Sequence, residues 1–211
     1  MTSDELITNI AGGPVRLLFD TNALFSSKAV RDVCRTAARI EVLLLTEAHS
    51  DVRGDRRIRL LVPAPVHGEK LFDLKQNWRD RYDVIKVEEA VLRLGLVVVP
   101  FGAEHARRLA GLLGDEFDTP ARWRDAKRQR CIECLGLKKL ESQVKGSGRN
   151  CGATIDWLIA AHALAEDCVL VTDDRGPEFE QVTSKLKLDT LREALHRVLD
   201  DPACLQGREG S

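Results

Sequence analysis

Two apolar runs in the sequence end in acidic residues. Val15–Phe19 is followed directly by Asp20, and Cys168–Val171 is followed within three residues by Asp173 and Asp174. Short apolar runs of this kind are typical of strands in a parallel sheet, where ligands bind at the carboxyl ends of the strands. The sequence therefore predicts that these carboxylates share one edge of a sheet.

Two more acids are expected at that edge. Asp156 lies in the first turn of the apolar segment Ala153–Ala165, and Glu69 lies near the start of a segment that follows Pro65. Helices that follow parallel strands begin at the carboxyl edge of the sheet. We therefore expect Glu69 and Asp156 to lie near Asp20.

Several carboxylates within a few ångströms repel one another strongly unless a cation joins them. Oxygen ligands select hard divalent ions such as Mg²⁺ or Mn²⁺. An ion of this kind lowers the pKa of a bound water and offsets the charge on a phosphate, which suits hydrolysis of phosphodiester bonds. The predicted ligands are Asp20, Glu69, Asp156 and Asp174, assisted by Asp173.

The chain has 211 residues and a net charge of −1, so its overall charge argues neither for nor against a nucleic-acid partner. No apolar run is long enough to span a bilayer. Six cysteines in a chain of this length do not resemble a secreted disulfide framework. We expect a single domain over 1–211 in the cytoplasm, without membrane contact, and with flexible ends at 1–13 and 201–211.

Residue spacing predicts an alternation of strands and helices. We expect strands over 15–20, 58–62, 96–101 and 168–171, and helices from about residue 27 and over 66–78, 84–94, 103–113, 118–135, 153–165 and 190–199. Asp189 is expected to cap the last helix, and 42–45 is open between helix and strand. This order indicates an α/β sheet with helices on both faces and a helical insertion at 118–150.

Four stretches resemble the signature motifs of PIN-domain nucleases, most closely the toxin ribonucleases of VapBC toxin–antitoxin pairs. They are Phe19–Leu24, Val62–Glu69, Thr154–Leu164 and Leu170–Asp174. The resemblance implies a three-layer α/β/α PIN-like domain with a mainly parallel sheet. It also implies a Mg²⁺- or Mn²⁺-dependent endoribonuclease.

Residue by residue, the resemblance makes Asp20, Glu69, Asp156 and Asp174 the catalytic metal-binding acids, with Asn22 and Thr172 as their supports. It further implies an RNA substrate, a small antitoxin as a candidate partner, and a homodimer. The chain departs from the family pattern in its insertion at 118–150 and in a longer segment at 175–179.

The insertion is rich in basic residues, as an enzyme that cuts a polyanion requires. The predicted RNA contacts are Arg122, Arg124, Lys127, Arg128, Arg130 and Arg149. A second basic rim is conceivable at Arg53, Arg56, Arg57 and Arg59. The plainer interpretation of both groups is a solvated surface.

Other interpretations of the sequence stay open. Cys131, Cys134 and Cys151 supply three of the four ligands of a zinc site, although packing also explains their spacing. The chain could keep the fold as a non-catalytic RNA-binding protein or an RNA-processing factor. A phosphoryl-transfer protein of the receiver type would need a lysine at a distant strand end, which the sequence lacks. His162 is expected to be structural.

Overall fold

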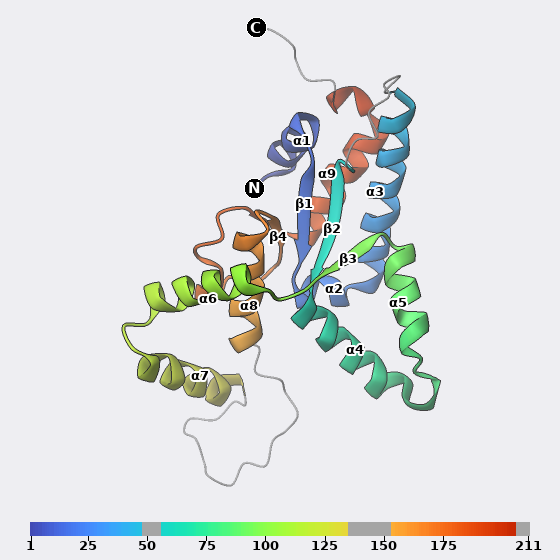
Figure 1. Ribbon diagram of the computed structural model, residues 1–211. Helices are drawn as coiled ribbons and strands as arrows, with labels where there is room; N and C mark the ends of the chain where they lie inside the picture. Colours follow the sequence, from blue (N-terminus) through green and yellow to red (C-terminus); the bar gives the residue numbers. More distant parts are fainter. Residues whose placement is uncertain (48–55, 135–152, 206–211) are drawn as a thin grey trace, which may run out of the picture.

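The protein is described here from a computed structural model, which places residues 1–47, 56–134 and 153–205 (Figure 1). In these ranges, one sheet of five parallel strands has the order β3-β2-β1-β4-β5. The strands are β1 Val15–Phe19, β2 Ile58–Pro63, β3 Leu96–Val99, β4 Val169–Val171 and β5 Lys185–Leu186. The predicted α/β class with a parallel sheet is confirmed.

β1 lies at the centre of the sheet, and all of its side chains except that of Arg16 are apolar and buried. Leu17, Leu18 and Phe19 are fully buried, as expected for a strand covered on both sides. Phe19 pairs with Val171 at the end of β4. The two strands therefore end level with each other, and the residues that follow them leave the sheet at the same edge.

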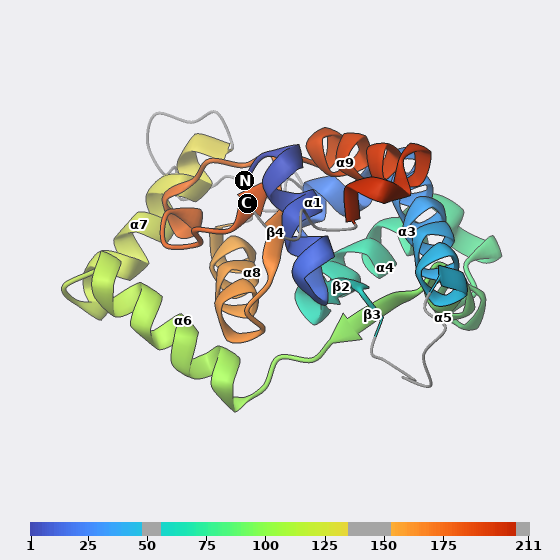
Figure 2. The ribbon, with the colours of Figure 1, turned by 90° about the horizontal axis from the view of Figure 1, so that it is seen from above.

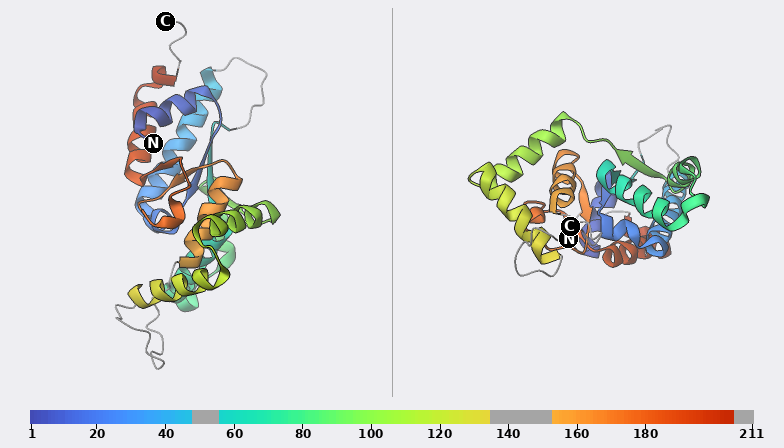
Figure 3. Two further views of the ribbon diagram at one scale, coloured as in Figure 1. Left: turned by 90° about the vertical axis from the view of Figure 1, so that its left-hand side faces the viewer. Right: turned by 90° about the horizontal axis from the view of Figure 1, so that it is seen from below.

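Helices cover both faces of the sheet. α1, α3 and α9 pack together on one face, and α6 and α8 lie together on the other (Figures 2 and 3). The helices are α1 Ser3–Gly12, α2 Thr21–Phe25, α3 Ser27–Glu47, α4 Ala64–Trp78, α5 Val84–Arg93, α6 Ala103–Glu116, α7 Pro120–Cys134, α8 Ala153–Ala165 and α9 Leu188–Asp200. Short 3-10 turns occupy Arg79–Arg81, Pro177–Phe179 and Pro202–Leu205.

The amino-terminal segment differs from the flexible lead-in expected at 1–13. It forms α1, which begins with a capping box in which the Thr2 side chain accepts from the Glu5 N–H and the Glu5 side chain accepts from the Thr2 N–H. Leu6, Ile7 and Ile10 are buried in the core. Their helical spacing anchors the segment against α9.

Three other details differ from the sequence prediction or complete it. Residues 42–45, left open between helix and strand, belong to α3. A two-residue strand, β5, is present where none was predicted. Asp189 lies in the first turn of α9 and does not cap it, because the N-cap residue is Lys187.

The predicted insertion is helical in the part that the structure describes. α7 packs on α8 through an aromatic cluster in which the Trp123 ring centroid lies 5.1 Å from that of Phe117 and 5.9 Å from that of Trp157. Residues 135–150 of the insertion lie outside the described ranges. No helix among the described residues is both long and apolar enough to cross a membrane.

Candidate functional site

Asp20 is a buried carboxylate at the end of β1. Its side chain is 1% exposed, and its backbone N–H donates to the Val171 carbonyl at 3.1 Å, which ties it to β4. Oδ1 accepts from the backbone N–H of Thr21 and so caps α2. Oδ2 accepts from Thr172 Oγ1 at 2.6 Å. Two donors on two elements therefore fix the orientation of Asp20.

The pKa of Asp20 is raised from 3.8 to about 6. Burial is the main cause, and the hydrogen bond from Thr172 opposes it. The nearby carboxylates of Asp174 and Glu69 raise the pKa further. The charged form of Asp20 is thus held in an unfavourable environment, and a positive charge at this place would relieve it.

Asp174 is held by two partners. Its backbone N–H donates to Thr172 Oγ1 at 3.0 Å, and its Oδ2 accepts from Asn22 Nδ2 at 2.8 Å. The hydroxyl of Thr172 therefore donates to Asp20 and accepts from Asp174. Thr172 and Asn22 are predicted as supports of the acids; Thr172 forms hydrogen bonds with Asp20 and Asp174, and Asn22 forms one with Asp174.

Glu69 and Asp156 reach the same place from two helices. Glu69 lies in the second turn of α4, and its Oε2 accepts from Thr21 Oγ1 at 2.7 Å. α4 can begin directly after β2 because Pro65 stands in its first turn, where no N–H partner is needed. Asp156 lies in the first turn of α8.

One cavity of about 520 Å³ brings these four acids together. Asp20, Glu69, Asp156 and Asp174 all line it, although they come from four separate stretches of the chain. Asp173 does not line the cavity and is exposed to solvent. The four predicted acids therefore line one cavity, and Asp173 lies outside it.

The cavity also contains residues that the sequence did not single out. Asp73 lines it from α4, four residues after Glu69 and therefore on the same helix face. The four-residue spacing from Glu69 could have identified Asp73 as a cavity residue from the sequence. The aromatic rings of Phe25 and Phe72 line the cavity as well, and they are 36% and 53% exposed. Their exposure was not predictable, because apolar residues at such positions usually belong to the core.

The acids of the cavity are separated by hydrogen-bond donors. Thr172 and Thr21 hold Asp20, Thr21 also holds Glu69, and the amide of Asn22 holds Asp174. Among the described residues, no three His, Cys, Asp or Glu side chains stand as a group that could hold a metal ion. The cavity contains carboxylate oxygens of the type that binds a hard divalent cation, but among the described residues the carboxylates do not form one close group.

Four of the predicted RNA-binding residues have described side chains, namely Arg122, Arg124, Lys127 and Arg128; they lie on α7 and do not line the cavity that contains the four acids. Arg122 pairs with Asp118, Arg128 pairs with Asp125 at 3.6 Å, and Lys127 Nζ lies 4.7 Å from the Trp123 ring centroid. Arg124 is exposed. The side chains of Arg130, Arg149, Cys131, Cys134 and Cys151 lie outside what the structure describes, so the prediction of a zinc site is not addressed.

His162 lies deep in the core between α8 and α6. It is 0% exposed, and its Nδ1 lies 2.8 Å from the Leu158 carbonyl. Its ring centroid is 4.3 Å from that of His105. This position agrees with the structural role expected for His162.

The chain was compared with known proteins at the level of sequence. No protein-family model matches it, and no curated protein resembles it significantly.

Proposed function

We propose that the protein is a Mg²⁺- or Mn²⁺-dependent endoribonuclease with a PIN-like fold. The observation that carries the proposal is the cavity in which buried Asp20 lies beside Glu69, Asp156 and Asp174. An acid whose pKa is raised to about 6 by burial and by neighbouring carboxylates is poorly explained as a structural residue.

The side chains of the cavity fit a hard divalent cation in type. Asp20, Glu69, Asp156 and Asp174 would hold it through oxygen atoms only. When bound, such an ion supplies a water of lowered pKa and offsets the charge of the phosphate. Glu69 and Asp156 are partly exposed and stand on helices, so rotation about their side-chain bonds can bring them toward the fixed carboxylate of Asp20.

Other residues of the chain would position the substrate and the acids. Thr172 and Asn22 hold Asp20 and Asp174 in place. The exposed ring of Phe72 offers a flat face on which an unpaired base can stack. The Phe25 ring offers only the face that Lys70 does not cover, since Lys70 Nζ lies 4.1 Å from the centroid of this ring. Exposed aromatic rings beside a phosphate-directed site favour a single-stranded substrate over a duplex, whose bases are already stacked.

A non-catalytic RNA-binding protein of the same fold is the second candidate. It is favoured by the separation of the acids, which do not stand as a ready metal site among the described residues. The toxin role, a small antitoxin partner, a homodimer and a cytoplasmic location stay predictions from the resemblance and composition.

The test is cleavage of single-stranded RNA by the purified protein in Mn²⁺ or in EDTA. We expect cleavage in Mn²⁺ only, and a loss of about 100-fold or more for Asp20→Asn and Asp156→Asn, because each removes a metal-binding charge. Asp173→Asn is the matched control, since its carboxylate lies outside the cavity, and it should keep the wild-type rate. Cleavage in EDTA, or an Asp20→Asn protein that cuts RNA at the wild-type rate, would show that the assignment is wrong.

A further inference from the structure

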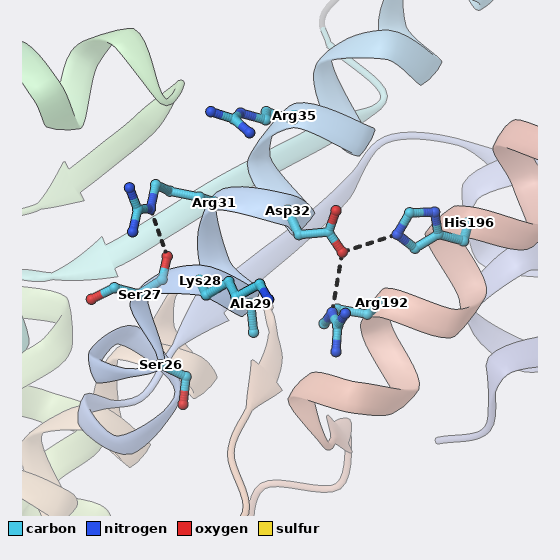
Figure 4. Close-up of a pocket in the computed structure, with 9 residues that line it drawn as sticks. All are labelled: Ser26, Ser27, Lys28, Ala29, Arg31, Asp32, Arg35, Arg192 and His196. Carbon is cyan, nitrogen blue, oxygen red and sulfur yellow. Dashed lines mark hydrogen bonds and ion pairs between the residues drawn. The ribbon is translucent and has the colours of Figure 1, made fainter.

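A second, larger cavity lies between α3 and α9 (Figure 4). It is a groove of about 980 Å³ whose lining is mostly basic. α3 contributes Lys28, Arg31 and Arg35, and α9 contributes Arg192 and His196. We call this feature the basic groove. It is distinct from the acidic cavity and from the basic residues of α7.

Among the described residues, one carboxylate lines the basic groove, and it already forms hydrogen bonds with basic side chains of α9. Asp32 Oδ2 lies 3.2 Å from Arg192 Nε and 2.9 Å from His196 Nε2, as Figure 4 shows. Both hydrogen bonds hold the pKa of Asp32 below its usual value, and the bond from His196 has the larger effect. Arg192 also binds Asp189 at 3.2 Å. The charge of Arg192 is therefore largely compensated within the protein.

The three cations of α3 are not compensated in this way. Lys28, Arg31 and Arg35 are exposed, and within the part of the chain that the structure describes no ion pair joins any of them to a carboxylate. They follow one another at intervals of three and four residues, which places them along one side of the helix. At about 1.5 Å per residue they span about 10 Å, so they form a linear row of positive charge.

The basic groove adjoins the acidic cavity. α2 forms the wall between them, because Asn22 and Phe25 line the acidic cavity while Ser26 and Ser27, the next residues, line the basic groove. A ligand that extends from the acidic cavity over the end of α2 reaches the first turn of α3. There it meets Lys28, and then Arg31 and Arg35 beyond it.

We propose that the basic groove binds the phosphodiester backbone of a single RNA strand whose scissile bond lies in the acidic cavity. The proposal rests on the proposed nuclease function and adds the route of the strand across the surface. A row of uncompensated cations next to exposed aromatic rings is the combination that binds single-stranded nucleic acid. An acidic polypeptide would use the cations but has no use for Phe25 beside the groove.

The test measures binding of a fluorescent single-stranded RNA in EDTA, by anisotropy, over a series of salt concentrations. The variant Lys28→Ala/Arg31→Ala/Arg35→Ala should bind at least about tenfold more weakly at low salt. The slope of log K against log salt should become shallower by about 2, because each lost phosphate contact contributes about 0.7. The matched control is Arg81→Ala/Arg107→Ala/Arg108→Ala, which removes three exposed cations that line neither cavity and should leave the slope unchanged.

Each outcome decides the proposal. A shallower salt slope for the α3 variant alone supports the proposal. If the triple variant does not fold, the single variants Lys28→Gln and Arg35→Gln provide the same measurement. Equal slopes in the wild type and the α3 variant, equal losses in both triple variants, or tighter binding of poly-glutamate than of RNA would overturn it. Because binding is measured without metal, it is separate from the cleavage assay: a protein that cuts RNA but shows no slope change keeps the nuclease function and loses this route.

Discussion

Asp20 is buried, and the nearby carboxylates of Asp174 and Glu69 make its negative charge less favourable. Its pKa of about 6 lies above the value of 3.8 expected in an unfolded chain. A raised carboxylate pKa adds stability below the unfolded value, and this contribution is lost as the pH rises through the folded value. The difference between the two pKa values corresponds to about 3 kcal/mol at neutral pH. Without a cation, Asp20 therefore destabilises the folded protein.

In EDTA at pH 8, Asp20→Asn should be more stable to urea than the wild type. We expect a gain of about 1–2 kcal/mol, less than the full shift because the new amide must rearrange its hydrogen bond with Thr172. Below about pH 3 the gain should vanish, since Asp20 is then protonated in both states. Asp173→Asn, which changes an exposed carboxylate, should show no such gain. A destabilised Asp20→Asn protein at pH 8 would contradict the environment described for Asp20.

The sequence predicted which four acids line one cavity, but it did not predict the orientation of their side chains. Asp20 and Asp174 could be placed because each closely follows a strand, and Glu69 and Asp156 because each lies near a helix start. The outward direction of Asp173 could not be predicted, because adjacent residues in a turn differ in direction for reasons set by tertiary contacts. The hydrogen bond from Thr21 to Glu69 was also not predictable, since it depends on how α2 and α4 pack against each other.

α6 and α8 pack on each other around buried histidines. His105 Nδ1 accepts from the Gly102 N–H at 3.0 Å, and its Nε2 lies 3.2 Å from Glu166 Oε1. Burial lowers the pKa of His162, and the neighbouring His105 also lowers it. His162 is therefore neutral in the folded protein near pH 7, and its protonation in the core is unfavourable.

The packing of these two helices should weaken in mild acid. A lowered histidine pKa gives stability that is present above the unfolded value near 6.5 and is lost as the pH falls through the folded value. Between pH 7 and pH 5 the wild type should therefore lose free energy of unfolding relative to His162→Gln, because glutamine does not titrate. Asp20 contributes in the opposite direction over this range, but its contribution is the same in both proteins and cancels in the comparison. Urea denaturation at several pH values measures both slopes, and parallel slopes would contradict the assignment.

At the element scale, apolar spacing predicted the long helices and four of the strands. β5 escaped prediction because two residues carry no periodic signal, and its pairing with β4 depends on tertiary structure. α1 was not predicted, because the polar and acidic residues at 1–13 indicated a flexible lead-in. The helical spacing of Leu6, Ile7 and Ile10 is the signal that indicates this helix. The bounds of α8 were predicted without error, since its apolar sequence admits few other structures.

The whole molecule separates its charges although their sum is close to zero. The acidic cavity lies at the carboxyl edge of the sheet, and the basic groove lies directly beyond α2. Net charge could not reveal this arrangement, because the two sets of charges cancel in the total. The basic groove was also beyond sequence analysis, since it requires that α3 and α9, far apart in the chain, lie side by side (Figure 2).

The proposed function requires that four carboxylates from four stretches of the chain bind a divalent ion. Titration with Mn²⁺, followed by the loss of its free electron-spin-resonance signal, tests this directly. We predict saturable binding that weakens by about tenfold or more in Asp20→Asn, Glu69→Gln, Asp156→Asn and Asp174→Asn, and is unchanged in Asp173→Asn. Wild-type protein without saturable binding, or variants that bind Mn²⁺ as tightly as the wild type, would contradict it.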